Sequence, residues 1–391
     1  MATLFPLAIL PGIEDPFSTP KIILLAGFVV LAGIFAVAGV RPSWPPLPRG
    51  FYFALIGWFS TLIVSAAIGQ YVSPESLFLS LLCIGWFIVA VALRANAVHV
   101  AAAVAASCTA VSIIAIMQYL GLDPFHLFGW ASIPYGSPRM RTYSTLGNPN
   151  FVGAFLVGGT PLFLALGKLL KRKALFSFLL LLNATAVLAT GSRAVSAAIM
   201  AALIWLVALR HSARWWLVAL AVLMITLIFA FTPARPLKTT IEGRFYIWQV
   251  IGSHMLERPL FGFGPGGFEP KYIEWETLYW REGRGYTNQR TFAALQAHAH
   301  NDYLETIVDR GFIGLSSLVS LLGSFLYSAF RQTKTTGSEL LAGASAGVVA
   351  LTLVAVVDFP FQRPAELFLL WTLMAVGYLA GLPSGEVSDD A

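Results

Sequence analysis

The stretch 340-LLAGASAGVVALTLVAVV-357 decides the fold of this chain, because its eighteen consecutive residues carry no charged side chain. A run of this length crosses the hydrocarbon core of a bilayer when it forms an α-helix. Ten further apolar runs lie at 21–40, 51–69, 76–93, 98–120, 150–167, 174–190, 194–209, 214–232, 312–330 and 365–382. The sequence therefore predicts eleven spans, with segment 2–12 as a short twelfth span or a re-entrant piece.

The composition of the whole chain agrees with this prediction. Of its 391 residues, 57% are hydrophobic and only 11% are charged, whereas soluble domains carry about 25% charged residues. A transmembrane β-barrel would instead show alternating segments of about ten residues. We expect an all-α, polytopic helical bundle of 11–12 transmembrane helices that forms one membrane domain over residues 1–391 and lies in a lipid bilayer.

Lysine and arginine residues predict the orientation of the bundle. Eleven of them lie in short loops on one side, and the short loops of the other side hold four: Arg139, Arg141, Arg193 and Arg363. The richer side is predicted to be cytoplasmic, which puts the long loop 233–302 outside. The net charge of +6 is spread along the chain, so we expect no nucleic-acid partner.

The centres of the predicted spans carry no Asp, Glu, Lys or Arg. Ion-coupled transporters usually keep ionisable side chains at the bilayer midplane, so their absence argues against that class. A passive channel or a flippase with a neutral polar path stays open. Gln118 and Asn183 are the strongly polar residues deep in spans, and we interpret both as interhelical hydrogen-bond partners.

The most polar cluster, 298-HAHNDYLE-305, directly precedes an apolar run. Asp302 is predicted to cap a helix, with Glu305 completing a capping box and Gly311 ending the helix. The two histidines need no such role. They suit general base chemistry, although a polar loop or half of a metal site are alternatives. We expect no metal and no cofactor, because a third ligand with standard spacing is missing.

Two polar breaks at the outer ends of spans, 146-LGNPNFVGAF-155 and 190-TGSRAVSAAI-199, are the next candidates. Asn150 is predicted to cap the helix that follows it. An arginine at membrane depth is costly unless it meets an anion. We therefore expect Arg193 to bind a lipid diphosphate through paired hydrogen bonds.

Within the long loop, Phe245, Trp248, Ile251 and Met255 recur at helical spacing, which predicts an amphipathic helix at the membrane interface. The segment 262-GFGPGG-267 that follows is typical of a plain turn, with backbone N–H groups for a phosphate as the alternative. The aromatic residues Trp248, Tyr272 and Trp275 are interpreted as interfacial, or as receiving sugars.

Taken together, these motifs resemble the O-antigen ligase and O-antigen polymerase superfamily of bacterial membrane glycosyltransferases. The similar pieces, in chain order, are GNPNFVGAF (147–155), GSRA (191–194), GRFYIWQ (243–249), PLFGFGPGGF (259–268) and HAHNDYLETIVDRGFIGL (298–315). The resemblance covers about half of the chain. It implies a polytopic inner-membrane protein whose active site faces the periplasm.

The resemblance also implies an activity, namely metal-independent, inverting transfer of a glycan from undecaprenyl diphosphate. It assigns the base to His300, and the two arginines of the family pattern correspond to Arg193 and Arg244. We expect further substrate contacts from His298, Arg139, Arg141, Asn148, Asn150, Asn301 and Trp248. The arginines would hold the diphosphate while His300 takes the proton of the acceptor hydroxyl.

The identity of the acceptor separates the remaining alternatives. A ligase would use lipid A-core, another glycan or a protein, whereas a polymerase would extend a second lipid-linked repeat. The closely spaced HAHN and GNPN blocks favour the ligase. A membrane transporter and a non-catalytic partner of a glycan assembly complex are alternatives from other classes.

Overall fold

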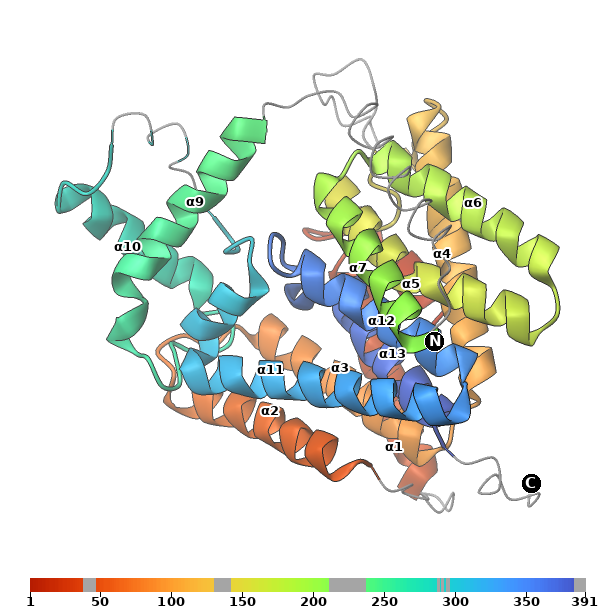
Figure 1. Cartoon of the computed structure of the whole chain (residues 1–391). Helices are drawn as coiled ribbons and strands as arrows, with labels where there is room; N and C mark the ends of the chain where they lie inside the picture. Colours follow the sequence, from red (N-terminus) through yellow and green to blue (C-terminus); the bar gives the residue numbers. More distant parts are fainter. Residues whose placement is uncertain are drawn as a thin grey trace.

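The computed structural model describes residues 1–37, 47–129, 142–210, 237–286, 289, 292 and 296–382. Over these residues the regular elements are all helices (Figure 1). Continuous apolar runs satisfy their backbone hydrogen bonds internally as helices, which is what a bilayer demands. The all-α prediction is therefore confirmed.

Ten of the eleven predicted spans correspond to helices. They are α1 (Thr19–Val37), α2 (Arg49–Ile68), α3 (Pro74–Ala92), α4 (Ala97–Tyr119), α5 (Pro149–Leu169), α6 (Lys173–Thr190), α7 (Arg193–Arg210), the later part of α11 (Asp302–Thr336), α12 (Glu339–Val354) and α13 (Pro364–Ala380). The predicted span 214–232 lies outside the described residues. Segment 2–12 holds only the 3₁₀ turn η1 (Phe5–Leu7), so it is not a twelfth span.

In the described part of the chain, six helices are long and apolar enough to cross a membrane, namely α2, α3, α4, α5, α6 and α11. Shorter apolar segments lie in α1, α7, α12 and α13. These helices fit a polytopic membrane bundle, and the chain is a multi-pass membrane protein.

The centre of the bundle is formed by α5, α12 and α13, and α6 lies at its edge (Figure 1). The apolar window of α5 is 78% buried, but that of α6 is only 17% buried. Small residues allow the central helices to approach closely, because a Cβ atom on Gly347 of α12 would collide with the carbonyl oxygen of Gly158 on α5. The central helices are thus held by close packing against one another.

The two polar residues deep in spans have different partners. Asn183 on α6 accepts a hydrogen bond from the Thr160 hydroxyl on α5 at 2.8 Å, so its prediction as an interhelical partner is confirmed. Gln118 instead donates to Asp123 and accepts from the Ser144 backbone N–H. The prediction for Gln118 was wrong because it lies one residue before the end of α4, within reach of the following loop.

The helix α11 bends at Gly311, whose φ of 68° and ψ of −173° lie outside the helical range. The predicted helix end at Gly311 is confirmed, and the membrane-spanning part resumes after it. The predicted cap is wrong by one residue, since Asn301, not Asp302, accepts from the backbone N–H groups of Tyr303 and Leu304.

The cap of α5 also differs from the prediction. Asn148 accepts from the backbone N–H of Asn150 at 2.9 Å and is the capping residue. Sequence alone favoured Asn150 because both asparagines suit the position. Pro149 explains the outcome, since proline is most favourable at the first helical position and so places the cap directly before it.

The long loop contains α9 (Leu237–His254), η3 (Met255–Glu257) and α10 (Phe268–Arg281), and these build a second hydrophobic core. Its buried stripe on α9 is Tyr246, Ile247, Val250 and Ile251, whereas Phe245 is 55% exposed. The predicted stripe therefore shared only Ile251 with the observed one. Tyr272 and Trp275 are completely buried in this core, which corrects their interpretation as interfacial residues.

The glycine-rich segment 262–267 is a structural turn, as its simpler interpretation predicted. The carboxylate of Asp309 accepts from the backbone N–H groups of Gly266 and Phe268, each at 3.0 Å. A Cβ atom on Gly264 would collide with the Tyr71 carbonyl oxygen, and its φ is +112°. These N–H groups hold the long loop 233–302, called the outer loop below after its predicted side of the membrane, against α11. Gly266 and Phe268 therefore do not offer their N–H groups to a phosphate.

Candidate active site at the start of helix α11

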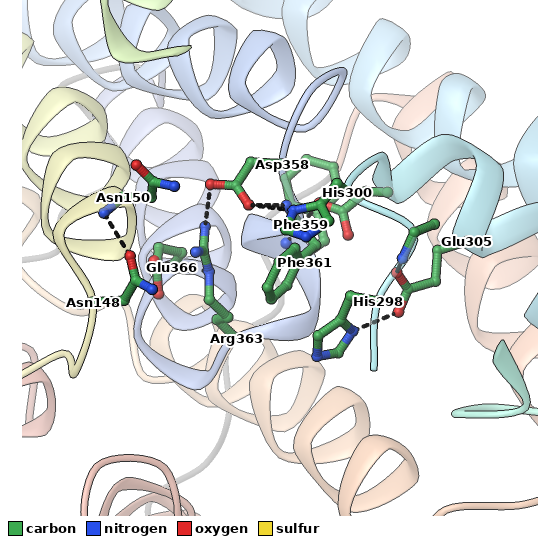
Figure 2. Close-up of polar contacts among 12 residues, drawn as sticks. Asn148, Asn150, His298, His300, Glu305, Asp358, Phe359, Phe361, Arg363 and Glu366 are labelled. Atoms are coloured by element: carbon green, nitrogen blue, oxygen red, sulfur yellow. Dashed lines mark hydrogen bonds and ion pairs between the residues drawn. The ribbon is translucent and has the colours of Figure 1, made fainter. Parts of the chain in front are cut away.

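Three segments that are distant in sequence meet at one place: residues 298–301, the loop 355–363 between α12 and α13, and the first turn of α5 (Figure 2). The backbone N–H of Asp302 donates to Ala355 O at 2.9 Å, and the Asp302 carboxylate accepts from the N–H of Phe361 at 2.8 Å. Asp302 therefore joins the start of α11 to the loop between the last two helices.

This junction brings His300 to Asp358. The His300 Nδ1 atom lies 3.7 Å from Asp358 Oδ1, and the histidine side chain is 32% exposed whereas that of the aspartate is 2% exposed. His300 has a positive φ of 50°, a strained backbone conformation typical of functional sites. The arrangement pairs a solvent-accessible imidazole with a buried carboxylate.

Asp358 remains ionised in this environment. Burial alone would raise the pKa of its carboxyl, but the charge of Arg363, followed by the influence of His300 and Arg244, lowers that pKa to about 2. Positive groups close to a carboxylate stabilise its charged form. Asp358 thus supplies a fixed negative charge beside His300.

Arg363 holds Asp358 from the side opposite the histidine. Its guanidinium lies 3.8 Å from the ring centroid of Phe151 and 4.8 Å from that of Phe359. Its Nη2 atom is 3.7 Å from Asp358 Oδ2, and its Nε atom is 3.1 Å from Glu366 Oε1. Arg363 is buried, and we interpret it as a support for Asp358.

His298 faces a carboxylate of its own. Its Nδ1 atom lies 2.8 Å from Glu305 Oε1, whose side chain is only 3% exposed. Its ring stacks on Phe359 with 4.1 Å between centroids, and His300 meets the same ring at 5.1 Å, edge to face. The two predicted histidines are therefore brought together around one aromatic side chain.

Arg244 reaches the site from the outer loop. It is half-buried on α9, and its charge interacts with Asp358. Burial lowers the pKa of its guanidinium, and the negative charge of Asp358 opposes that effect. On the next turn, Trp248 donates from Nε1 to Ala299 O at 3.0 Å. The helix α9 is thus docked against the histidine segment.

The remaining predicted site residues are placed less completely. Asn148 and Asn301 use their side chains as helix caps, and Asn150 lies in the first turn of α5, directly after Asn148 and Pro149 (Figure 2). Arg193 begins α7, but its side chain is outside the described part, and Arg139 and Arg141 lie in the undescribed range 130–141. Their predicted substrate contacts stay predictions.

Asp358 and Glu305 were not predicted from the sequence as partners of the histidines. Asp358 lies in 358-DFPFQR-363, between two apolar runs. The signal that could have indicated Asp358 was the presence of a carboxylate and an arginine in so short a connection between two spans. Asp358 is far from His300 along the chain. Its pairing with His300 depends on how α11, α12 and α13 pack together, which the sequence does not show.

The chemistry of these groups is that of proton transfer beside an anion site. A histidine oriented by a carboxylate can accept a proton, and a nearby arginine can stabilise a phosphate. Among the described residues, no cluster of three or more His, Cys, Asp and Glu side chains is placed to hold a metal ion. The expected lack of a metal and of a cofactor stays a prediction.

Comparison with protein families gives a match to part of the chain. Residues 178–319, which are less than half of the chain, match the model of a protein family described as O-antigen ligase. No curated protein matches the chain. The matched range contains Arg193, Arg244 and both histidines and ends before Asp358. The match confirms the resemblance to the O-antigen ligase superfamily, so that this part of the chain is similar to membrane glycosyltransferases of the O-antigen ligase and polymerase type.

Proposed function

We propose that the protein transfers a glycan from undecaprenyl diphosphate to an acceptor hydroxyl at the periplasmic face of the bacterial inner membrane, as an O-antigen ligase does. The observation that carries the proposal is the His300 ring beside the buried, ionised Asp358, at 3.7 Å, with Arg244 facing the same carboxylate. The family match over residues 178–319 supports the reaction class.

His300 acts as the general base. Asp358 holds the Nδ1 side of its ring, which leaves Nε2 to take the proton of the acceptor hydroxyl. The separation of 3.7 Å is longer than a hydrogen bond. Catalytic hydrogen bonds in empty sites are often long and shorten when the substrate binds.

Arg244 and Arg193 hold the diphosphate of the donor. A guanidinium presents two parallel N–H groups to phosphate oxygens, and its charge stabilises the leaving group. The acceptor oxygen attacks the anomeric carbon as the bond to the diphosphate breaks, so one displacement inverts the configuration. Arg363 serves the base instead, because its faces are covered by Phe151 and Phe359.

The acceptor is lipid A-core or a similar glycan. The site lies at the ends of α5, α11 and α13, where a lipid-linked donor held between helices would meet a hydroxyl from the aqueous side. A polymerase would use the same base and the same arginines on a second lipid-linked repeat, and a protein acceptor would need no different chemistry. The test must therefore vary the acceptor.

The test uses the purified protein in lipid discs with an undecaprenyl-diphosphate oligosaccharide, with and without lipid A-core. The expected result is one acceptor-dependent product band that disappears in His300→Ala while the variant keeps its thermal stability. A ladder of products without lipid A-core would replace the ligase by a polymerase. Equal product from His300→Ala would remove His300 from the mechanism.

A further inference from the structure

The site contains two histidine–carboxylate pairs, yet a single displacement needs only one base. His300 faces Asp358, and His298 faces Glu305 (Figure 2). The pair His298–Glu305 is the tighter of the two, at 2.8 Å against 3.7 Å. Its geometry calls for a role of its own.

Glu305 fixes both the position and the proton of His298. One carboxylate oxygen accepts a hydrogen bond from His298 Nδ1 at 2.8 Å, and the other accepts from the Ala299 backbone N–H at 2.8 Å. The stack on Phe359, with planes 22° apart, fixes the plane of the imidazole ring. Because Nδ1 donates to Glu305, only Nε2 is left for a substrate, and it has no partner in the described part of the chain.

The reaction develops negative charge on the diphosphate, where one more hydrogen-bond donor would be stabilising. When the acceptor oxygen bonds to the anomeric carbon, the electron pair of the broken bond stays on the diphosphate, which gains one negative charge. The proton of the acceptor passes to His300. A preorganised donor aimed at an oxygen where charge develops stabilises the transition state more than the bound substrate.

We propose that His298, oriented by Glu305 and in its imidazolium form, donates a hydrogen bond from Nε2 to the departing diphosphate. This role rests on the proposed function and adds a catalytic residue to it. It needs no complete proton transfer, because a diphosphate leaves without a strong acid. Glu305 is the positioning residue, since it acts on the diphosphate only through His298.

The surrounding charges set the protonation of His298. Burial alone would lower its pKa, but the Glu305 carboxylate, by its charge and its hydrogen bond, raises the pKa above its usual value. The other groups that face it are Asp309 on α11, Arg363 before α13, and Glu75 in the first turn of α3, with Asp358 and His300 beyond Phe359. The imidazolium is present at low pH and is lost as the pH rises through this raised pKa.

The experiment measures the rate of transfer against pH in lipid discs for the full chain and for Glu305→Gln. The amide oxygen of glutamine can still accept from Ala299 N–H, but it carries no charge. The alkaline limb of the profile should move to lower pH by about one unit, because removing a neighbouring opposite charge shifts a pKa by at least that much. His254→Gln is the matched control, since His254 also faces a carboxylate, Glu257, at 3.4 Å, but in the outer-loop core.

A second variant separates catalysis from folding. His298→Gln should lower kcat about 100-fold, as loss of one preorganised donor does, with little change in KM or in thermal stability. A uniform loss of rate at all pH values in Glu305→Gln, or an unchanged kcat in His298→Gln, would overturn the role of His298. If His300→Ala were fully active, the proposed function would fail instead, whatever the His298 variants did.

Discussion

Two regions of the molecule meet at the site, and they are held together in different ways. The loop 355–363 is anchored between α12 and α13, whose side chains are buried almost throughout. The outer-loop region, α9 and α10, has its own core, fastened by polar links such as Tyr246 OH to Glu276 at 2.8 Å and Trp275 Nε1 to Glu257 at 2.8 Å. The bundle region supplies Asp358, and the outer loop supplies Arg244.

This difference predicts which substitutions should affect stability and activity together and which should affect activity alone. A group buried in the bundle region supports both the fold and the base, because its charge has no access to water. Arg244 on the outer loop is only half-buried and can be removed with less harm to the fold. Substitutions in the two regions should therefore fail in different ways.

The largest expected effect is that of Arg363→Met on stability. The substitution leaves the buried carboxylates of Asp358 and Glu366 without their shared cation, and breaking such a buried pair costs about 3–5 kcal/mol. Thermal unfolding in lipid discs should show a clear loss of stability relative to Arg281→Met, an exposed arginine on α10. Equal stability of the two variants would mean that the bundle region tolerates the charge imbalance.

Asp358→Asn should have the largest effect on activity in a protein that still folds. Without a negative charge beside its ring, His300 is a poorer base, and general base catalysis is worth about 1,000-fold in rate. The measurement is the initial rate of transfer at saturating donor. Glu339→Gln, which breaks the surface pair of Glu339 with Lys168, is the control and should keep the wild-type rate. If Asp358→Asn were as fast as the wild type, the charge of Asp358 would not be needed for His300 to act as the base.

Arg244→Ala should lower the rate about 100-fold, the effect of removing one preorganised group that stabilises developing charge, and should leave thermal stability nearly unchanged. Arg363→Met is expected to lose stability, whereas Arg244→Ala is expected to lose rate. This pair of variants therefore compares the two regions most directly. If Arg244→Ala lost as much stability as Arg363→Met, the outer loop and the bundle would be one cooperative unit.

The sequence predicted the membrane spans well, because continuous apolar runs leave a helix as the only way to satisfy the backbone in a bilayer. It also placed Gly311 at a helix end and predicted that His298, His300 and Arg244 belong to one active site. The caps were off by one or two residues because neighbouring Asn and Asp residues are equally suited to the position.

The sequence could not predict the partners of the histidines. Asp358 lies beside His300 only because Asp302 ties the start of α11 to Ala355 and Phe361, a contact between segments more than fifty residues apart. The buried stripe of α9 was missed for a similar reason. Its buried face depends on the partner helix α10, not on the membrane plane that the spacing suggested.

The smallest expected effect is that of Trp248→Phe. This change keeps an aromatic ring and removes the hydrogen bond to Ala299 O, which is worth about 1 kcal/mol. The rate should fall less than tenfold, with the loss in kcat because the histidine segment becomes less well positioned. Tyr286→Phe, an exposed ring elsewhere in the outer loop, should cause no loss, and an equal loss in both variants would argue against docking through Trp248.

The most direct test of the account is chemical rescue of His300→Ala by free imidazole, measured as the rate of glycan transfer from undecaprenyl diphosphate in lipid discs. We expect the variant to lose about 1,000-fold or more of its rate, at least as much as Asp358→Asn and within the range of general base catalysis, and to regain part of it as imidazole is added. His298→Ala serves as the comparison. Full activity of His300→Ala without imidazole would contradict the assignment of His300 as the base.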